Sequence, residues 1–110
     1  MVKVSVFYPY SDGKEFDMAY YVEKHMPMVR GKLGAACKGL AVDHGVGGGA
    51  PGASPTYVAI GHAFFDSVEA FQTAWAPHAN AIMADVPNYT AIRPVMQVSE
   101  VKLASFSHAA

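Results

Sequence analysis

The sequence predicts a single α+β domain in which four strands and two helices follow the order strand, helix, strand, strand, helix, strand. Three observations support this order. Four segments are rich in β-branched and aromatic residues, two longer segments carry apolar residues at helical spacing, and glycine or proline separates most of them. With 110 residues the chain has the length of one domain with one modest core. We therefore expect one domain over residues 1–103 and a short tail over residues 104–110.

The first strand and the first helix occupy the amino-terminal third of the chain. Residues 2–8 alternate as a strand does, and Pro9 followed by a Ser-Asp-Gly turn signal ends the segment. Asp17 can cap the helix that follows, and Gly34 predicts its end. Pro27 lies inside the helix and predicts a kink or a restart there. The apolar stripe of this helix consists of Met18, Val22, Met26, Val29 and Leu33.

Two strands joined by a glycine-rich loop come next. Residues 37–46 form the second predicted strand, and the apolar run at residues 57–65 forms the third. Residues 47–55 cannot offset their ordering entropy with buried side chains, so we expect a mobile loop. By alternation, the third strand places Tyr57 and Phe65 on one face, and Val58, Ile60 and Phe64 on the other.

The second helix and the last strand complete the predicted domain. Asp66 or Ser67 caps the helix, with Glu69 forming a capping-box pattern on Asp66. Pro77 predicts a break in this helix, and residues 93–103 form the fourth strand. The apolar stripe of the helix consists of Val68, Phe71, Trp75, Ala79, Ile82 and Val86.

This element order is that of the ferredoxin-like, or split βαβ, fold, in which two helices cover one face of a four-stranded antiparallel sheet. Both faces of the predicted sheet look apolar, since the first strand places Val4 and Val6 on one face and Phe7 on the other. An apolar outer face would be exposed unless something covered it, and the simplest cover is a second copy of the same sheet. We therefore expect a homodimer.

Composition narrows the range of partners. Charged residues make up 15% of the chain and the formal net charge is −1, which favours neither disorder nor a nucleic-acid-binding surface. The lone Cys37 excludes an internal disulfide framework, the amino terminus shows no signal segment, and no apolar run is long enough to span a bilayer. We expect a cytoplasmic protein that binds neither nucleic acid nor membrane.

Two motifs resemble those of the EthD family, over roughly residues 2–103. The first is Phe16-x-x-x-Tyr20-Tyr21-x-x-x-His25-x-Pro27, and the second is Asp85-Val86-Pro87-Asn88-Tyr89-Thr90. The resemblance implies a dimeric α/β barrel, whose ferredoxin-like subunits pack sheet against sheet and hold a pocket between sheet and helices. The family is named for an accessory protein that is required, beside a cytochrome system, for the degradation of ethyl tert-butyl ether. The resemblance thus implies oxidative catabolism, as an oxidoreductase or as an accessory to a monooxygenase.

Tyr21 and His25 are the candidate catalytic residues. They lie four residues apart, on the same side of the first helix and at the edge of its apolar stripe. The pKa of a histidine, near 6.5, suits a general acid or base, and a phenol one turn away can orient it or a ligand. The alternative is structural, with His25 donating to the carbonyls that Pro27 leaves free. The motif of the resembling family includes this histidine, and both interpretations stay open.

A ligand between sheet and helices would contact further side chains. His62 points into either the pocket or the subunit interface, and a buried ring there needs a hydrogen-bond partner. Met18, Phe64 and Trp75 can line a pocket for an apolar compound, although each also suits the core. Haem is an alternative ligand, with His25 or His62 as its axial ligand. The histidine spacings include no zinc-binding pair, so no metal site is predicted.

Two main functional hypotheses result. In the first, an enzyme or accessory protein of oxidative catabolism binds a small apolar compound, with His25 as acid or base and Tyr21 assisting it. In the second, a non-catalytic dimer carries a hydrophobic metabolite and His25 is purely structural. A dimeric scaffold is the third possibility, and a haem-binding protein is a further alternative.

Overall fold

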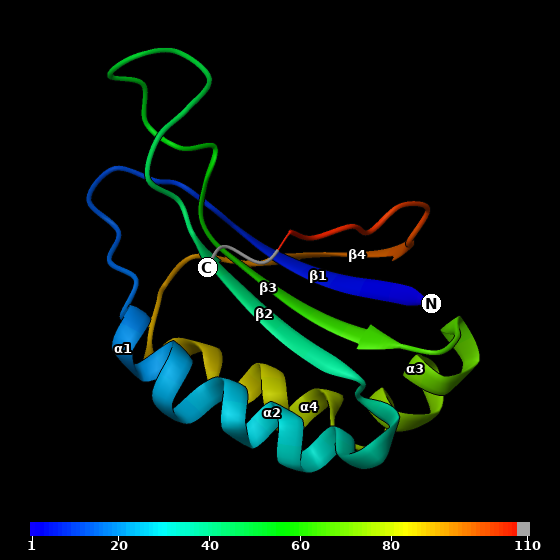
Figure 1. Ribbon diagram of the computed structural model, residues 1–110. Coiled ribbons are helices and arrows are strands. Elements are labelled where there is room, and N and C mark those ends of the chain that lie inside the picture. The colour runs from blue at the N-terminus through cyan, green and yellow to red at the C-terminus, as the bar shows by residue number, and fades with distance from the viewer. Residues whose placement is uncertain (108–110) are drawn as a thin grey trace.

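The computed structural model describes residues 1–107 as a four-stranded antiparallel sheet with helices on one face (Figure 1). The strand order is β2-β3-β1-β4. The strands are β1 (Val2–Pro9), β2 (Gly39–His44), β3 (Tyr57–Phe65) and β4 (Val95–Glu100). The helices are α1 (Met18–Tyr20), α2 (Met26–Leu33), α3 (Val68–Trp75) and α4 (Ala79–Ala84). This arrangement confirms the predicted α+β, ferredoxin-like fold. Part of the expected tail, residues 108–110, lies outside the described residues.

A π-helical turn, Tyr21–His25, joins α1 to α2. Asp17 caps α1 as predicted, because its Oδ1 accepts the amide hydrogen of Tyr20 at 3.0 Å. Pro27 lies in the first turn of α2, directly after the wider turn, which agrees with the predicted restart of the helix. The amide of Met26 bonds the carbonyl of Tyr21, five residues earlier. Such turns let a helix absorb an irregularity and often occur at functional sites.

Ser67, rather than Asp66, caps the second helical region. Its Oγ accepts the amide hydrogen of Ala70 at 3.0 Å. Val68 is 42% exposed and does not belong to the buried stripe, because it lies in the first turn on the solvent side. The break predicted at Pro77 is present, and it separates α3 from α4.

Ser67→Ala is expected to lower the free energy of unfolding by about 1 kcal/mol, since the amide of Ala70 loses its side-chain acceptor. Asp66→Ala is the matched control at the neighbouring exposed position, and it should cost much less. Urea denaturation of both variants measures the difference. Equal losses would contradict the assignment of Ser67 as the cap.

The register of the sheet places Tyr57 and Val58 of β3 on faces other than those predicted. A β-bulge lies where Tyr8 and Pro9 of β1 pair with β3. Tyr57 therefore packs against Phe7 on the outer face, with ring centroids 5.0 Å apart, and Val58 packs into the core. Alternation had placed Tyr57 on the face of Phe65 and Val58 on the face of Ile60, because it cannot anticipate an inserted residue.

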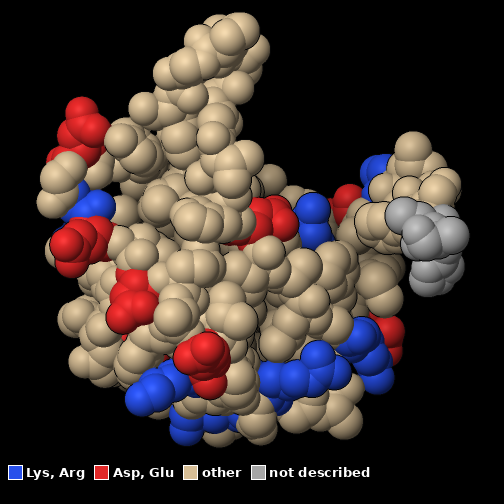
Figure 2. Space-filling model, turned by 60° about the vertical axis from the view of Figure 1, so that its left-hand side comes forward, with Lys and Arg blue, Asp and Glu red and all other residues tan. Residues whose placement is uncertain are grey.

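The second and fourth strands are shorter than predicted, and a loop connects β2 to β3. Pro94 has no amide hydrogen for the ladder and directly precedes β4. The loop, residues 45–56, projects from the body of the molecule and carries no charged side chain (Figure 2). The amide of Gly48 donates to the carbonyl of Ala53 across it.

The core fills the space between sheet and helices as two neighbouring clusters. The first contains Val2, Val4, Val29, Leu33, Cys37, Phe65, Phe71 and Ile82. The second is richer in tyrosine and contains Tyr8, Tyr21, Met26, Ala59, Val86, Tyr89 and Ile92. Among the described residues, none of the helices has the length and apolar character needed to cross a bilayer.

The outer face of the sheet is mixed rather than uniformly apolar, which corrects the expectation from strand alternation. Ser5 Oγ lies 2.8 Å from His62 Nδ1, and His62 Nε2 lies 2.8 Å from Asp43 Oδ2. These three side chains form a polar row across β1, β3 and β2. The apolar residues that share this face by register are Phe7, Tyr57, Ile60, Phe64 and Val95.

Candidate functional site

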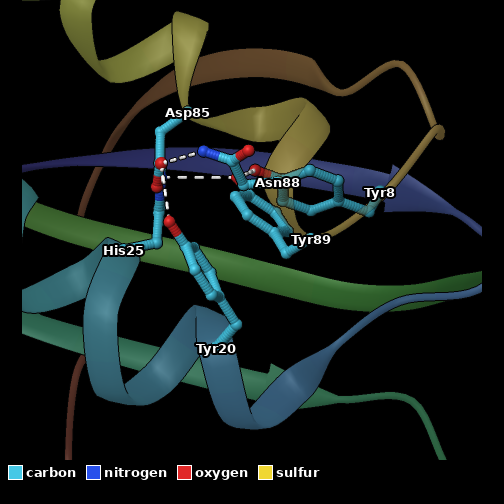
Figure 3. Close-up of polar contacts among 6 residues, drawn as sticks. All are labelled: Tyr8, Tyr20, His25, Asp85, Asn88 and Tyr89. Atoms are coloured by element: carbon cyan, nitrogen blue, oxygen red, sulfur yellow. Dashed lines mark hydrogen bonds and ion pairs between the residues drawn. The ribbon is translucent and has the colours of Figure 1, made fainter.

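A buried histidine and an aspartate form the centre of the candidate site (Figure 3). His25, at the end of the π-helical turn, is 4% exposed, and its Nδ1 lies 2.9 Å from Oδ2 of Asp85. Asp85 directly follows α4. Its other oxygen, Oδ1, accepts hydrogen bonds from the hydroxyl of Tyr20 and from Nδ2 of Asn88, each at 2.8 Å. The carboxylate is therefore held by three donors.

Two phenols continue this network on the other side of the imidazole. The hydroxyl of Tyr89 lies 3.3 Å from Nε2 of His25, and the hydroxyl of Tyr8 lies 2.6 Å from that of Tyr89. Because the Asp85 carboxylate can only accept, neutral His25 carries its proton on Nδ1. Nε2 is then an acceptor, so Tyr89 donates to it and Tyr8 donates to Tyr89.

Burial sets the protonation states of these groups. It lowers the pKa of His25 below its usual 6.5, although Asp85 acts in the opposite direction. Burial alone would raise the pKa of Asp85, but its three hydrogen bonds outweigh burial and lower it. Burial also raises the pKa of Tyr8 and of Tyr89. At neutral pH the site therefore holds a carboxylate, a neutral imidazole and two neutral phenols.

Both lowered pKa values should make the protein less stable in acid. The unfolded chain takes up a proton at His25 as the pH falls below about 6.5, before the folded protein does. Asp85 adds a further loss as the pH falls through its lowered pKa. We expect the free energy of unfolding in urea to decrease from pH 7 to 5, and to decrease less in His25→Gln. His44→Gln, at an exposed position, is the control, and an unchanged slope in His25→Gln would contradict this assignment.

The histidine borders an apolar cavity of about 50 Å³ between sheet and helices. Tyr8, Tyr21, His25 and His62 are among the residues of its wall, and the surface of the cavity is almost entirely apolar. Pockets for drug-sized ligands occupy several hundred Å³. A ligand therefore requires wall residues to move, and the flexible side chains of Met83 and Met96 suit this movement.

The structure brings together some of the residues proposed as a ligand site and separates others. Tyr21 stacks on the imidazole, with centroids 5.3 Å apart and ring planes 15° from parallel, and Trp75 lies in the cavity wall. Met18 packs beside the second core cluster and does not line this cavity. The strand at His62 forms part of the wall, but its ring joins the polar row of the outer face. Phe64 shares that outer face by register.

The orienting partner of His25 is Asp85, which sequence reasoning had not assigned to the site. Tyr20, Asn88 and Tyr89 were missed as well, although all four lie inside the two motifs. The motifs were therefore the available signal. The structural alternative expected His25 to donate to the helix carbonyls near Pro27. The structure does not show this contact, because the two ring nitrogens of His25 bond Asp85 and Tyr89.

Haem does not fit these residues readily. Both ring nitrogens of His25 and both of His62 already have hydrogen-bond partners, and the cavity beside His25 is far smaller than a porphyrin. Axial ligation would require one of these bonds to break. Within residues 1–107, no three His, Cys, Asp or Glu side chains gather as a metal site would require.

Comparisons with known proteins agree with this geometry. The family model described as the EthD domain matches residues 13–92, a range that contains both motifs. An EthD-like protein from Ralstonia eutropha is 46% identical, with 94% of each chain covered and a TM-score of 0.90. An ethyl tert-butyl ether D (EthD) family protein from Bacillus halodurans is 19% identical, covering 92% of this chain and 98% of that one, with a TM-score of 0.71.

More distant similarity concerns the fold alone. A dimeric ferredoxin-like protein of unknown function from Thermobifida fusca is 16% identical, covering 91% of this chain and 90% of that one, with a TM-score of 0.59. No curated protein matches the sequence. Because the family model spans most of the chain and the Ralstonia eutropha protein is similar over nearly its whole length, the chain belongs to the EthD family.

Proposed function

We propose that the protein binds a small apolar compound between sheet and helices, and that His25 acts on it as a general base and acid. The observation that carries this proposal is the neutral, buried imidazole, held by Asp85 at the wall of an apolar cavity. A carboxylate on Nδ1 fixes the tautomer and stabilises the imidazolium that forms when Nε2 takes up a proton. Tyr21 assists by stacking on the ring and fixing its plane.

The proposed context is oxidative catabolism in the cytoplasm, with the protein as an oxidoreductase or an accessory to a monooxygenase. Membership of the EthD family supports this context, since the Bacillus halodurans relative is named for ethyl tert-butyl ether. An acid–base residue would then process the substrate or the product of an oxidation. The apolar cavity suits such poorly soluble compounds.

We also propose that the working form is a homodimer joined through the outer face of the sheet. The apolar side chains that share this face with the polar row support a covered surface. The similar fold of a dimeric protein from Thermobifida fusca supports it too. Analytical ultracentrifugation at micromolar concentration tests this, and a stable monomer would contradict it.

A non-catalytic carrier of a hydrophobic metabolite is the second candidate function, because the cavity wall is largely apolar. Native mass spectrometry of small molecules that co-purify with the protein would first identify the ligand. His25→Gln then separates the two functions. We expect this variant to bind the ligand but to lose its conversion, whereas His44→Gln, at an exposed position, should retain both. A wild type that binds the ligand without converting it would favour the carrier, and full conversion by His25→Gln would contradict the role of His25 as the base.

A further inference from the structure

We propose that the proton passes between ligand and His25 through Tyr8 and Tyr89, and that the ligand is an apolar compound with one acidic hydroxyl, such as a phenol or an enol. This inference rests on the proposed function and specifies its substrate class. It assigns the contact with the ligand to Tyr8. Tyr89 becomes a positioning residue that acts through its neighbours.

The positions of the two phenols support this route. Nδ1 of His25 bonds Asp85 and Nε2 faces the hydroxyl of Tyr89, so the ring offers a ligand no nitrogen unless a bond breaks. Tyr89 is 4% exposed and, within the described part of the chain, is not among the residues that line the cavity. Tyr8 does line the cavity, and its hydroxyl lies 2.6 Å from that of Tyr89. The hydrogen-bonded path from cavity to imidazole therefore runs through both phenols.

The direction of the hydrogen bonds selects the polar group of the ligand. Tyr89 donates to the imidazole and Tyr8 donates to Tyr89. The hydroxyl of Tyr21 donates to Tyr8, so the oxygen of Tyr8 keeps one of its two acceptor positions. A ligand hydroxyl can donate to it. The third phenol at the wall, that of Tyr21, lies against Gly61 and neighbours Tyr8, with ring centroids 5.6 Å apart. The rest of the wall is largely apolar and suits a body without further polar groups.

The proton transfer balances without any change of oxidation state. The O–H bond of the ligand breaks as an O–H bond forms on Tyr8, which passes its original proton to Tyr89. Tyr89 passes its own proton to Nε2 of His25. The products are a ligand oxyanion and an imidazolium, which Asp85 stabilises at 2.9 Å. Because burial disfavours a phenolate on either tyrosine, both act as relays rather than as lasting acceptors.

The ligand must carry an acidic hydroxyl, because the neutral imidazole of His25 is a weak base. Burial lowers the pKa of His25, so an aliphatic alcohol would hold its proton far too strongly for transfer to the imidazole. A phenol or an enol is several orders of magnitude more acidic, since an unperturbed phenol has a pKa of about 10, well below that of water. Electron-withdrawing substituents would bring the two pKa values closer still.

A graded series of halogenated nitrophenols tests the relay, because their phenolates have a visible absorption band. Each compound is added to the full chain at a pH below its solution pKa. In the wild type we expect the more acidic members to be ionised when bound. Tyr89→Phe should bind them within about threefold of the wild-type affinity, but with an ionised fraction at least about tenfold smaller. Tyr8→Phe interrupts the same path at its other phenol and should reduce the ionised fraction to a similar degree.

Tyr57→Phe, on the outer face, is the matched control and should behave as the wild type does. Ionisation that persists in Tyr89→Phe and Tyr8→Phe but disappears in His25→Gln would overturn the relay and leave the proposed function intact. Ionisation that persists in His25→Gln would overturn both. A wild type that binds no phenol, or binds every member neutral, would overturn the assignment of an acidic hydroxyl compound.

Discussion

Gly61→Ala is expected to lower the free energy of unfolding by about 1–3 kcal/mol and to displace Tyr21 from His25. Gly61 lies in β3, and a Cβ built on it would overlap the hydroxyl oxygen of Tyr21. Tyr21 is 1% exposed and stacks on the imidazole, so its ring cannot retreat without disturbing the site. The absence of a side chain at this position therefore creates the space for the phenol.

Urea denaturation measures this loss, and two further variants control for it. Gly31→Ala, in α2, adds a Cβ with no heavy atom within 4 Å, and it should raise the free energy of unfolding by about 0.5–1 kcal/mol. Adding Tyr21→Phe to Gly61→Ala removes the overlapping oxygen and should restore much of the stability. A destabilisation by Gly61→Ala that Tyr21→Phe does not relieve would contradict the overlap as its cause.

Much of the fold could be predicted because its signals are local. The bounds of β3 coincide with an apolar run between turn residues, and Asp17 precedes the first helical turn that it caps. The failures involve partners across the sheet. The faces of Tyr57 and Val58 were reversed because the bulge depends on how β1 pairs with β3. The polar row at Ser5 likewise required the register of three strands.

The candidate site was predictable only in part, for the same reason. Tyr21 and His25 share a helix face at a spacing that can be read from the chain. Asp85 lies 60 residues from His25, and only the packing of helices and sheet brings the two together. The two motifs held the aspartate and Tyr89, but without a structure neither could be assigned to the imidazole. Tyr8 gave no signal at all, since it continues an ordinary strand pattern.

Asp85→Asn is expected to reverse the tautomer of His25 and so to abolish its use as a base. The carboxylate accepts from Tyr20 and Asn88 on one oxygen and from His25 on the other. The new amide keeps its oxygen toward Tyr20 and Asn88, so its NH2 group faces the imidazole and donates to Nδ1. The ring proton then moves to Nε2, which can no longer accept from Tyr89.

The consequence is a loss of proton transfer. We expect transfer to a bound acidic phenol to fall by a factor on the order of 10²–10⁴, the usual contribution of a general base. Nitrogen-15 NMR of the imidazole reports the tautomer directly. Asp43→Asn is the matched control, because it makes the same change beside His62 on the outer face, where the contact between the two side chains is 2.8 Å. If His25 kept its proton on Nδ1 in Asp85→Asn, the carboxylate would not be what fixes the tautomer, and the base would have to be oriented from the Tyr89 side alone.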